Sequence, residues 1–153
     1  MRFYGYNNMY LTGLHPGIQS LHGLGRMVLA TQGTPAWDTF VTWLDKHETA
    51  ILLKGPDHEG LQEVFAAWQR LRQEQEALPL SHFLEPGLNH SWTCVGVVLD
   101  EAVYLTEAEA LSPIEHKEIR ALSPMGRLDL GESRGWSWNK RAAALLQGYP
   151  LAS

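Results

Sequence analysis

Cysteine is almost absent from this sequence, because Cys94 is the single one among 153 residues. One cysteine excludes an intrachain disulfide framework and any zinc or iron–sulfur site built from several cysteines. No apolar run approaches the roughly 20 residues that a membrane-spanning helix needs, and no cationic, apolar leader opens the chain. We therefore expect a cytoplasmic protein with no membrane partner.

Positive charge is also scarce. The 12 lysines and arginines are outnumbered by 17 aspartates and glutamates, which gives a formal net charge of −5. This balance argues against a non-specific nucleic-acid binder, which normally carries a basic excess, and leaves only a local basic patch open. Apolar residues make up 44% of the chain and charged residues 19%, which excludes a disordered chain or a coiled coil. The length is that of one domain.

Strand-like and helix-like patterns alternate along the first hundred residues. The strand-like runs cover residues 3–11, 49–54, 79–84 and 92–99. Helical patterns begin near Pro16, at Thr34-Pro35 and after the capping residue Asp57, and Gly33 ends the first of them. This alternation predicts a three-layer α/β domain in which helices flank a mixed four-stranded sheet.

The composition changes after residue 100. Thr106 with Glu109, and Ser112 with Glu115, form capping-box patterns that predict two short helices. Residues 123–135 are rich in glycine, serine and proline and predict a loop, while residues 138–147 predict a last helix that ends at Gly148. We therefore divide the chain into an α/β domain at residues 1–122 and a helical C-terminal extension at residues 123–153, a loop plus a helix packed on the domain.

The first predicted helix has an apolar side and a polar side. The apolar side, expected to face the core, carries Ile18, Leu21, Val28 and Leu29. The opposite side carries His15, Gln19, His22 and Arg26, spaced four, three and four residues apart. Near a helix N-terminus, backbone N–H groups and the helix dipole favour an anion or a developing oxyanion. Either this stripe belongs to a site, or Gln19 and His22 are core-edge residues satisfied by backbone groups.

A second candidate element is the segment Glu-Pro-Gly-Leu-Asn-His at residues 85–90, which joins two predicted strands. Sites in α/β proteins are commonly built at strand ends. Glu85 opposite an imidazole of the first helix would form a general acid/base pair. The alternative is a solvated turn in which Glu85 has no role.

Four segments in order carry a resemblance to a known family. They are Gly-Ile-Gln-Ser-Leu-His at 17–22, Thr-Ala-Ile-Leu-Leu-Lys-Gly-Pro-Asp-His-Glu-Gly-Leu at 49–61, Leu-Ser-His-Phe-Leu-Glu-Pro-Gly-Leu-Asn-His at 80–90 and Thr-Cys-Val-Gly-Val at 93–97. Together they resemble the peptidyl-tRNA hydrolases of the archaeal and eukaryotic type. That family has a helix motif G-K-x-x-x-Q-x-x-H, a strand ending in lysine before an acid-rich helix start, a strand leading into D-A-G-x-T, and a last strand of T-x-x-x-I-G type. The resemblance covers residues 3–115.

The resemblance implies a reaction and a set of site residues. The family cleaves the ester that joins a peptide or acyl-amino acid to the 3′ end of tRNA. Its catalytic lysine falls on His15, its aspartate on Glu85 and its threonine on Asn89, while Gln19 and His22 match the motif. The resemblance therefore implies Glu85 and His15 as acid/base groups, oriented by Gln19, His22 and Asn89.

The resemblance also implies tRNA as the partner. Candidate RNA contacts are cations and loop residues, namely Arg26, Gly87, His90, Arg134, Lys140 and Arg141. The last three accompany Trp136 and Trp138, an aromatic and basic mixture that could stack bases and hold phosphates. The alternative is a tail helix that docks through its tryptophans.

Seven histidines raise a metal hypothesis. In this hypothesis His15, His22, His82 and His90 converge, but their spacing lacks the compactness of zinc sites. We therefore predict no metal and no cofactor, and a peptidyl-tRNA hydrolase-like esterase. Two alternatives stay open: a catalytically degenerate member of that fold that binds RNA or protein, and an unrelated small-molecule hydrolase. A homodimer stays open as the assembly.

Overall fold

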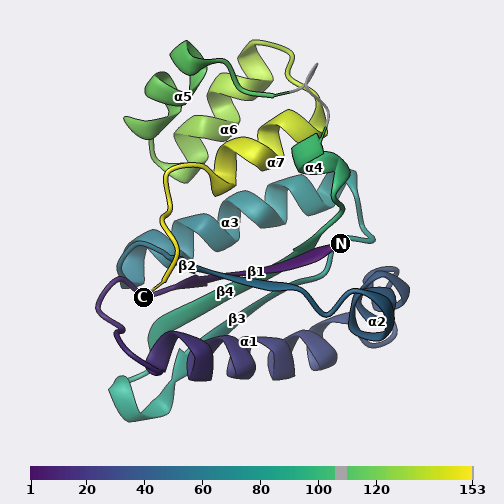
Figure 1. The fold of residues 1–153 in the computed structure, drawn as a ribbon, viewed down its shortest axis with the longest axis vertical. Helices are drawn as coiled ribbons and strands as arrows, with labels where there is room; N and C mark the ends of the chain where they lie inside the picture. The colour runs from purple at the N-terminus through teal and green to yellow at the C-terminus, as the bar shows by residue number, and fades with distance from the viewer. Residues whose placement is uncertain (106–109, 153) are drawn as a thin grey trace.

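The computed structural model describes residues 1–105 and 110–152 and confirms the three-layer α/β architecture (Figure 1). Its sheet contains β1 (Arg2–Asn7), β2 (Ala50–Lys54), β3 (Leu80–Glu85) and β4 (Ser91–Leu99), in the order β2-β1-β4-β3. β1 is parallel to β2 and antiparallel to β4, and β4 is also antiparallel to β3. The sheet is therefore mixed and four-stranded, as predicted.

Helices cover both faces of the sheet. One face carries α1 (His15–Thr31) and α2 (Ala36–Lys46), and the other carries α3 (His58–Glu74) (Figure 1). Beyond α3 lie α4 (Ala102–Leu105), α5 (Pro113–Arg120), α6 (Pro124–Ser133) and α7 (Trp138–Leu146). This end of the chain thus adds a further helical layer outside α3.

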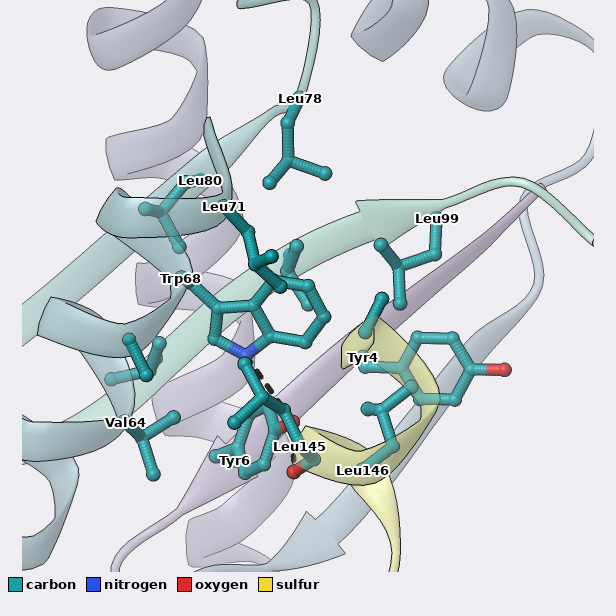
Figure 2. Packing of buried hydrophobic residues seen from close by; sticks show 14 of the residues in the cluster. Tyr4, Tyr6, Val64, Trp68, Leu71, Leu78, Leu80, Leu99, Leu145 and Leu146 are labelled. Atoms are coloured by element: carbon teal, nitrogen blue, oxygen red, sulfur yellow. Dashed lines mark hydrogen bonds between the residues drawn. The ribbon is translucent and has the colours of Figure 1, made fainter. Parts of the chain in front are cut away.

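The larger core cluster lies between the sheet and α3 (Figure 2). At its centre the fully buried Trp68 donates from Nε1 to the hydroxyl of Tyr6 at 3.3 Å. That hydroxyl donates in turn to the backbone carbonyl of Leu145 in α7 at 2.8 Å. Sheet, α3 and α7 are therefore joined by one buried chain of hydrogen bonds as well as by apolar packing.

Helix α1 does not bury the apolar side that the sequence predicts, so the prediction of its buried side is wrong. Its buried residues are Pro16, Gln19, Ser20, Gly23, Met27 and Thr31. The predicted core residues are exposed by 43% at Ile18, 67% at Leu21, 37% at Val28 and 67% at Leu29. Of the predicted polar stripe only Gln19 is buried. It and the neighbouring Ser20 find partners there, and the Ser20 hydroxyl donates to Asn7 Oδ1 at 3.1 Å. Gly23 brings the helix close, since a Cβ at this position would lie 2.9 Å from Cys94 Sγ.

Two further predictions of local structure need correction. β1 ends at Asn7 rather than at residue 11, because the Asn8 side chain accepts from the Tyr10 N–H at 3.0 Å and turns the chain. The predicted loop at 123–135 contains helix α6, which starts with a proline at its first position and is capped by the Ser123 hydroxyl on the Gly126 N–H.

Two of the expected helix caps are present. The Asp57 side chain accepts from the Gly60 N–H at the start of α3, at 2.9 Å. Ser112 and Glu115 form the reciprocal capping box at the start of α5. The predicted box of Thr106 and Glu109 lies outside the described residues. Within the described residues, no helix combines the length and the apolar character that crossing a membrane requires.

The last described residues lie along the outer edge of β2. Leu151 forms an antiparallel bridge with Leu53, and the Lys54 N–H donates to the Pro150 carbonyl at 2.7 Å. The Ala152 N–H donates to the Leu52 carbonyl at 2.9 Å. This tail therefore covers one edge of the sheet.

Candidate functional site

Glu85 stands at the end of β3, where it accepts hydrogen bonds on both carboxylate oxygens. Gln19 donates from Nε2 to Oε2 at 2.9 Å, and the Gly87 N–H donates to Oε1 at 3.1 Å. The Gln19 bond, followed by the Gly87 bond, lowers the pKa of the Glu85 carboxyl from its ordinary value. Glu85 is therefore a carboxylate at neutral pH.

The orientation of Gln19 is held from β4. This residue is 5% exposed, and its Oε1 accepts from the Thr93 hydroxyl at 2.8 Å. Because the amide oxygen faces Thr93, the amide nitrogen faces Glu85. Side chains from α1, β4 and β3 thus form one continuous hydrogen-bonded row that ends on the carboxylate.

His22 lies beside this row, one helical turn beyond Gln19. Its Nδ1 is 3.9 Å from Glu85 Oε2, and its ring centroid is 4.5 Å from that of Phe83. The side chain is 45% exposed. An imidazole that faces a carboxylate on one side and solvent on the other is a group that can take a proton from water, with the carboxylate stabilising the cation that forms.

Neither His15 nor the Asn89 side chain is bonded to Glu85, Gln19 or His22 in the part of the chain that the structure describes. His15 is the exposed first residue of α1 and forms neither a hydrogen bond nor an ion pair with Glu85 in the structure. Seven residues separate it from His22, which corresponds to roughly 10 Å along a helix at 1.5 Å per residue. The imidazole next to the carboxylate is therefore that of His22, and a role for His15 stays a prediction.

The loop after Glu85 has unusual backbone geometry. A short 3-10 turn, η1 (Pro86–Leu88), is followed by Asn89 and His90, both left-handed with φ values of 54° and 57°. A non-glycine residue held in this region costs on the order of 1–3 kcal/mol. The His90 N–H donates to the Glu85 carbonyl at 3.0 Å, which draws the loop back onto the end of β3. Exposed Asn89 and His90 are thus held in a strained loop beside the carboxylate.

The C-terminal cations are engaged within the protein. Their partners are Glu118 for Arg134 at 2.5 Å, Glu115 for Lys140 at 2.8 Å and Glu74 for Arg141 at 2.6 Å. Arg141 is 9% exposed and binds Glu74 through two nitrogens, so its guanidinium is engaged within the protein, and an RNA contact there stays a prediction. Trp138 donates from Nε1 to the Leu71 carbonyl at 3.0 Å, which docks α7 on α3. These residues attach the extension to the domain.

A groove of about 570 Å³ starts at this loop and follows β3. Its lining includes Arg26 from α1, Arg72 and Phe65 from α3, His82 from β3 and His90 from the loop. His82 stacks on Trp92 with ring centroids 4.4 Å apart. Burial, and then the charge of Arg26, lower the pKa of the His82 imidazole. Arg26 and His90 were predicted site residues, whereas Arg72 and Phe65 were missed, because nothing in the sequence reveals which strand forms the edge of the sheet.

The metal hypothesis finds no support in the residue clusters. Within residues 1–105 and 110–152, no three histidine, cysteine, aspartate or glutamate side chains stand close enough to hold an ion. Burial raises the pKa of the Cys94 thiol to about 12, which keeps it protonated, so Cys94 is a small apolar residue of the core. The site is therefore one of carboxylate, imidazole and amide groups.

Comparison with known proteins adds no name to this arrangement. No family model matches the chain, and no curated protein matches it.

Proposed function

We propose that the protein is a hydrolase that cleaves the ester bond of an acylated or peptidyl-tRNA, with His22 and Glu85 at its catalytic centre. The observation that carries this proposal is the convergence of Gln19, His22 and Glu85 at the end of β3. The four segments that resemble the peptidyl-tRNA hydrolases lie on α1, on β2 with the start of α3, on β3 with its loop, and on β4. Those segments thus contribute every member of the hydrogen-bonded row.

In the proposed reaction, His22 is the general base. It takes a proton from a water molecule, the resulting hydroxide attacks the ester carbonyl, and the proton is returned to the 3′ oxygen of the leaving tRNA. Glu85 stabilises the imidazolium and holds the ring in position. Its own lowered pKa makes it a weak base, which favours this supporting role. The exposed loop residues Gly87 and His90 lie where the substrate would approach, next to the carboxylate.

Gln19 and Thr93 are positioning residues in this scheme. Thr93 directs the Gln19 amide toward Glu85, and Gln19 holds the carboxylate in the orientation that faces His22. Loss of the Thr93 hydroxyl would free the amide to rotate. Thr93→Val is therefore expected to lower kcat more than to raise KM, whereas Thr93→Ser keeps the hydroxyl and is expected to restore most of the rate.

The experiment is hydrolysis of N-acetyl-phenylalanyl-tRNA by the purified protein, measured as released N-acetyl-phenylalanine. Glu85→Gln and His22→Asn are each expected to lower kcat by about a hundredfold or more, the usual scale for a positioned acid/base group. His15→Gln is the matched control, because it changes an exposed histidine of the same helix that does not contact Glu85. Loss of turnover in His15→Gln but not in His22→Asn would overturn the assignment of the base. Absence of turnover in the unaltered protein would overturn the proposed function.

One observation favours a second candidate, a binding module with the same fold. Two of the three positions to which the resemblance assigns chemistry, His15 and Asn89, form no hydrogen bond or ion pair with the Glu85 side chain. A module of this kind would bind tRNA with an affinity that falls steeply with salt concentration and would release no N-acetyl-phenylalanine. The same assay, run beside a binding titration at two salt concentrations, separates the two functions.

A further inference from the structure

The two edges of the sheet differ in the protection they receive. The β2 edge is covered by the tail at residues 150–152, whereas β3 pairs only with β4 among the described residues. The Pro79 carbonyl accepts from the Val98 N–H, so it points toward β4. Because backbone groups alternate in an antiparallel pair, the N–H and C=O groups of Leu80 and His82 point away from the sheet. Among the described residues these backbone groups have no hydrogen-bond partner; His82 is half-buried and Leu80 is 2% exposed.

The free edge of β3 forms the floor of an elongated groove. Helix α1 flanks it on one side, where the Ser81 hydroxyl donates to the Gly23 carbonyl at 2.8 Å, and α3 flanks it on the other, where Phe65 packs on His82. A first section of about 570 Å³ is followed by a second of about 560 Å³, and both are lined by Ala30 and Arg72. A strand of six residues spans about 20 Å. The groove thus has the shape for an extended chain.

Both walls of the groove carry an arginine. Arg26 projects from α1 and Arg72 from α3, and neither has a carboxylate within ion-pair distance among the described residues. The first section of the groove is lined by no carboxylate among the described residues. In the second section, Glu76 is the one described lining residue that carries a carboxylate. Proteins usually protect a free edge with lysine, proline or a covering segment. Here two arginines stand beside the edge, and no described segment pairs with it.

We propose that this groove binds an extended acidic segment of a partner protein, which adds to the free edge of β3 as a fifth strand. The backbone of the segment would pair with Leu80 and His82. Side chains of a strand alternate between its two faces, so acidic residues at adjacent positions would reach Arg26 on one wall and Arg72 on the other. A second copy of this chain does not fit, because its own β3 is recessed between α1 and α3 in the same way.

The test uses a fluorescein-labelled peptide of eight residues, threonine and valine with two adjacent glutamates at its centre. Binding to the full chain is measured by fluorescence anisotropy at low salt. One matched peptide carries two lysines instead of the two glutamates. A second matched peptide keeps the glutamates, but those of its backbone amides that would face β3 are N-methylated. Both matched peptides are expected to bind at least tenfold more weakly.

Variants of the protein test the two walls. Arg26→Gln combined with Arg72→Gln is expected to weaken binding roughly tenfold, as two partly exposed ion pairs would. Arg120→Gln removes the same type of charge from the exposed surface of α5, outside the groove, and is expected to leave binding unchanged. Amide shifts of Leu80 and His82 in an NMR titration report whether the peptide reaches the edge.

Several results would overturn the inference. Equal binding of the N-methylated peptide would show that the backbone of β3 is not used. A ten-nucleotide oligouridylate that displaces the peptide and depends on Arg26 and Arg72 would identify the groove as an RNA site. A dimer that forms with rising protein concentration and is broken by the peptide would assign the edge to a second copy. Turnover at Glu85 enters none of these measurements, so the inference stands or fails separately from the proposed function.

Discussion

Replacing Gly23 by alanine is expected to destabilise the protein, although alanine is the better helix former. In an open helix position this change stabilises by up to about 1 kcal/mol. At Gly23 the new Cβ would lie 2.9 Å from Cys94 Sγ, and the helix is held there by the bonds of Ser20 and Gln19 to the sheet. Overpacking of this kind costs about 1–3 kcal/mol. We therefore expect a net loss of about 1 kcal/mol in the free energy of unfolding.

Removing Cys94 Sγ, the atom that the new Cβ would approach too closely, gives a sharper test. In a Cys94→Ala background, the nearest remaining atom is Cβ of residue 94, at the ordinary contact distance of 3.7 Å. Gly23→Ala should then stabilise the protein, so that the sign of its effect reverses and the coupling energy is about 2 kcal/mol. Gly25→Ala is the control in the same helix, because a Cβ there has no atom within 4 Å.

The assay is urea unfolding followed by tryptophan fluorescence for the unaltered protein, each single variant and the double variant. With a slope of about 2 kcal/mol per molar urea, a difference of 2 kcal/mol shifts the midpoint by about 1 M. If Gly23→Ala stabilised the protein as much as Gly25→Ala does, the close approach of α1 to the sheet would be refuted. An effect of Gly23→Ala that is independent of Cys94 would refute the assignment of the clash.

Two further predictions concern buried polar groups. Tyr6→Phe leaves the Trp68 N–H and the α7 carbonyl without their partner and should cost about 1–3 kcal/mol in thermal or urea unfolding, whereas Tyr10→Phe on the surface should change nothing. The hydrogen bond from Arg141 lowers the pKa of the Glu74 carboxyl below its ordinary 4.5. The pair therefore contributes its full stability above about pH 4.5, and this stability is lost as the pH falls through the lowered pKa of Glu74. Glu74→Gln should therefore lower the unfolding midpoint at pH 7 and have a smaller effect at pH 3, and an equal effect at both pH values would contradict the assignment.

The predictions from sequence succeeded where the signal is local. The Asp57 cap and the box of Ser112 and Glu115 are read from residues three positions apart, and both form as expected. The α/β alternation needs only the period of each segment, and the sheet confirms it. The α6 helix was missed because its glycine and serine content hides the cap at Ser123.

The sequence allowed the residues of the site to be predicted, but not which of them contact one another. Gln19 and His22 were identified from helical spacing and Glu85 from its place at a strand end, and the three converge. The choice between His15 and His22 depends on where β3 crosses α1, and both residues lie on the same helical stripe. The buried side of α1 was predicted wrongly for a related reason, since the buried Ser20 and Gln19 are satisfied by Asn7 and Thr93, which lie on strands of the sheet.

The tail that covers the β2 edge is synthesised long after β2 itself. Leu53 is bridged by Leu151, which follows it by almost a hundred residues. At about 5–20 residues per second, a ribosome needs roughly 5–20 s to make that length of chain. During this interval the outer edge of β2 has been synthesised but not covered, and it can pair with another strand. We therefore expect chains truncated before residue 150 to aggregate during expression, because the edge then has no strand to close it.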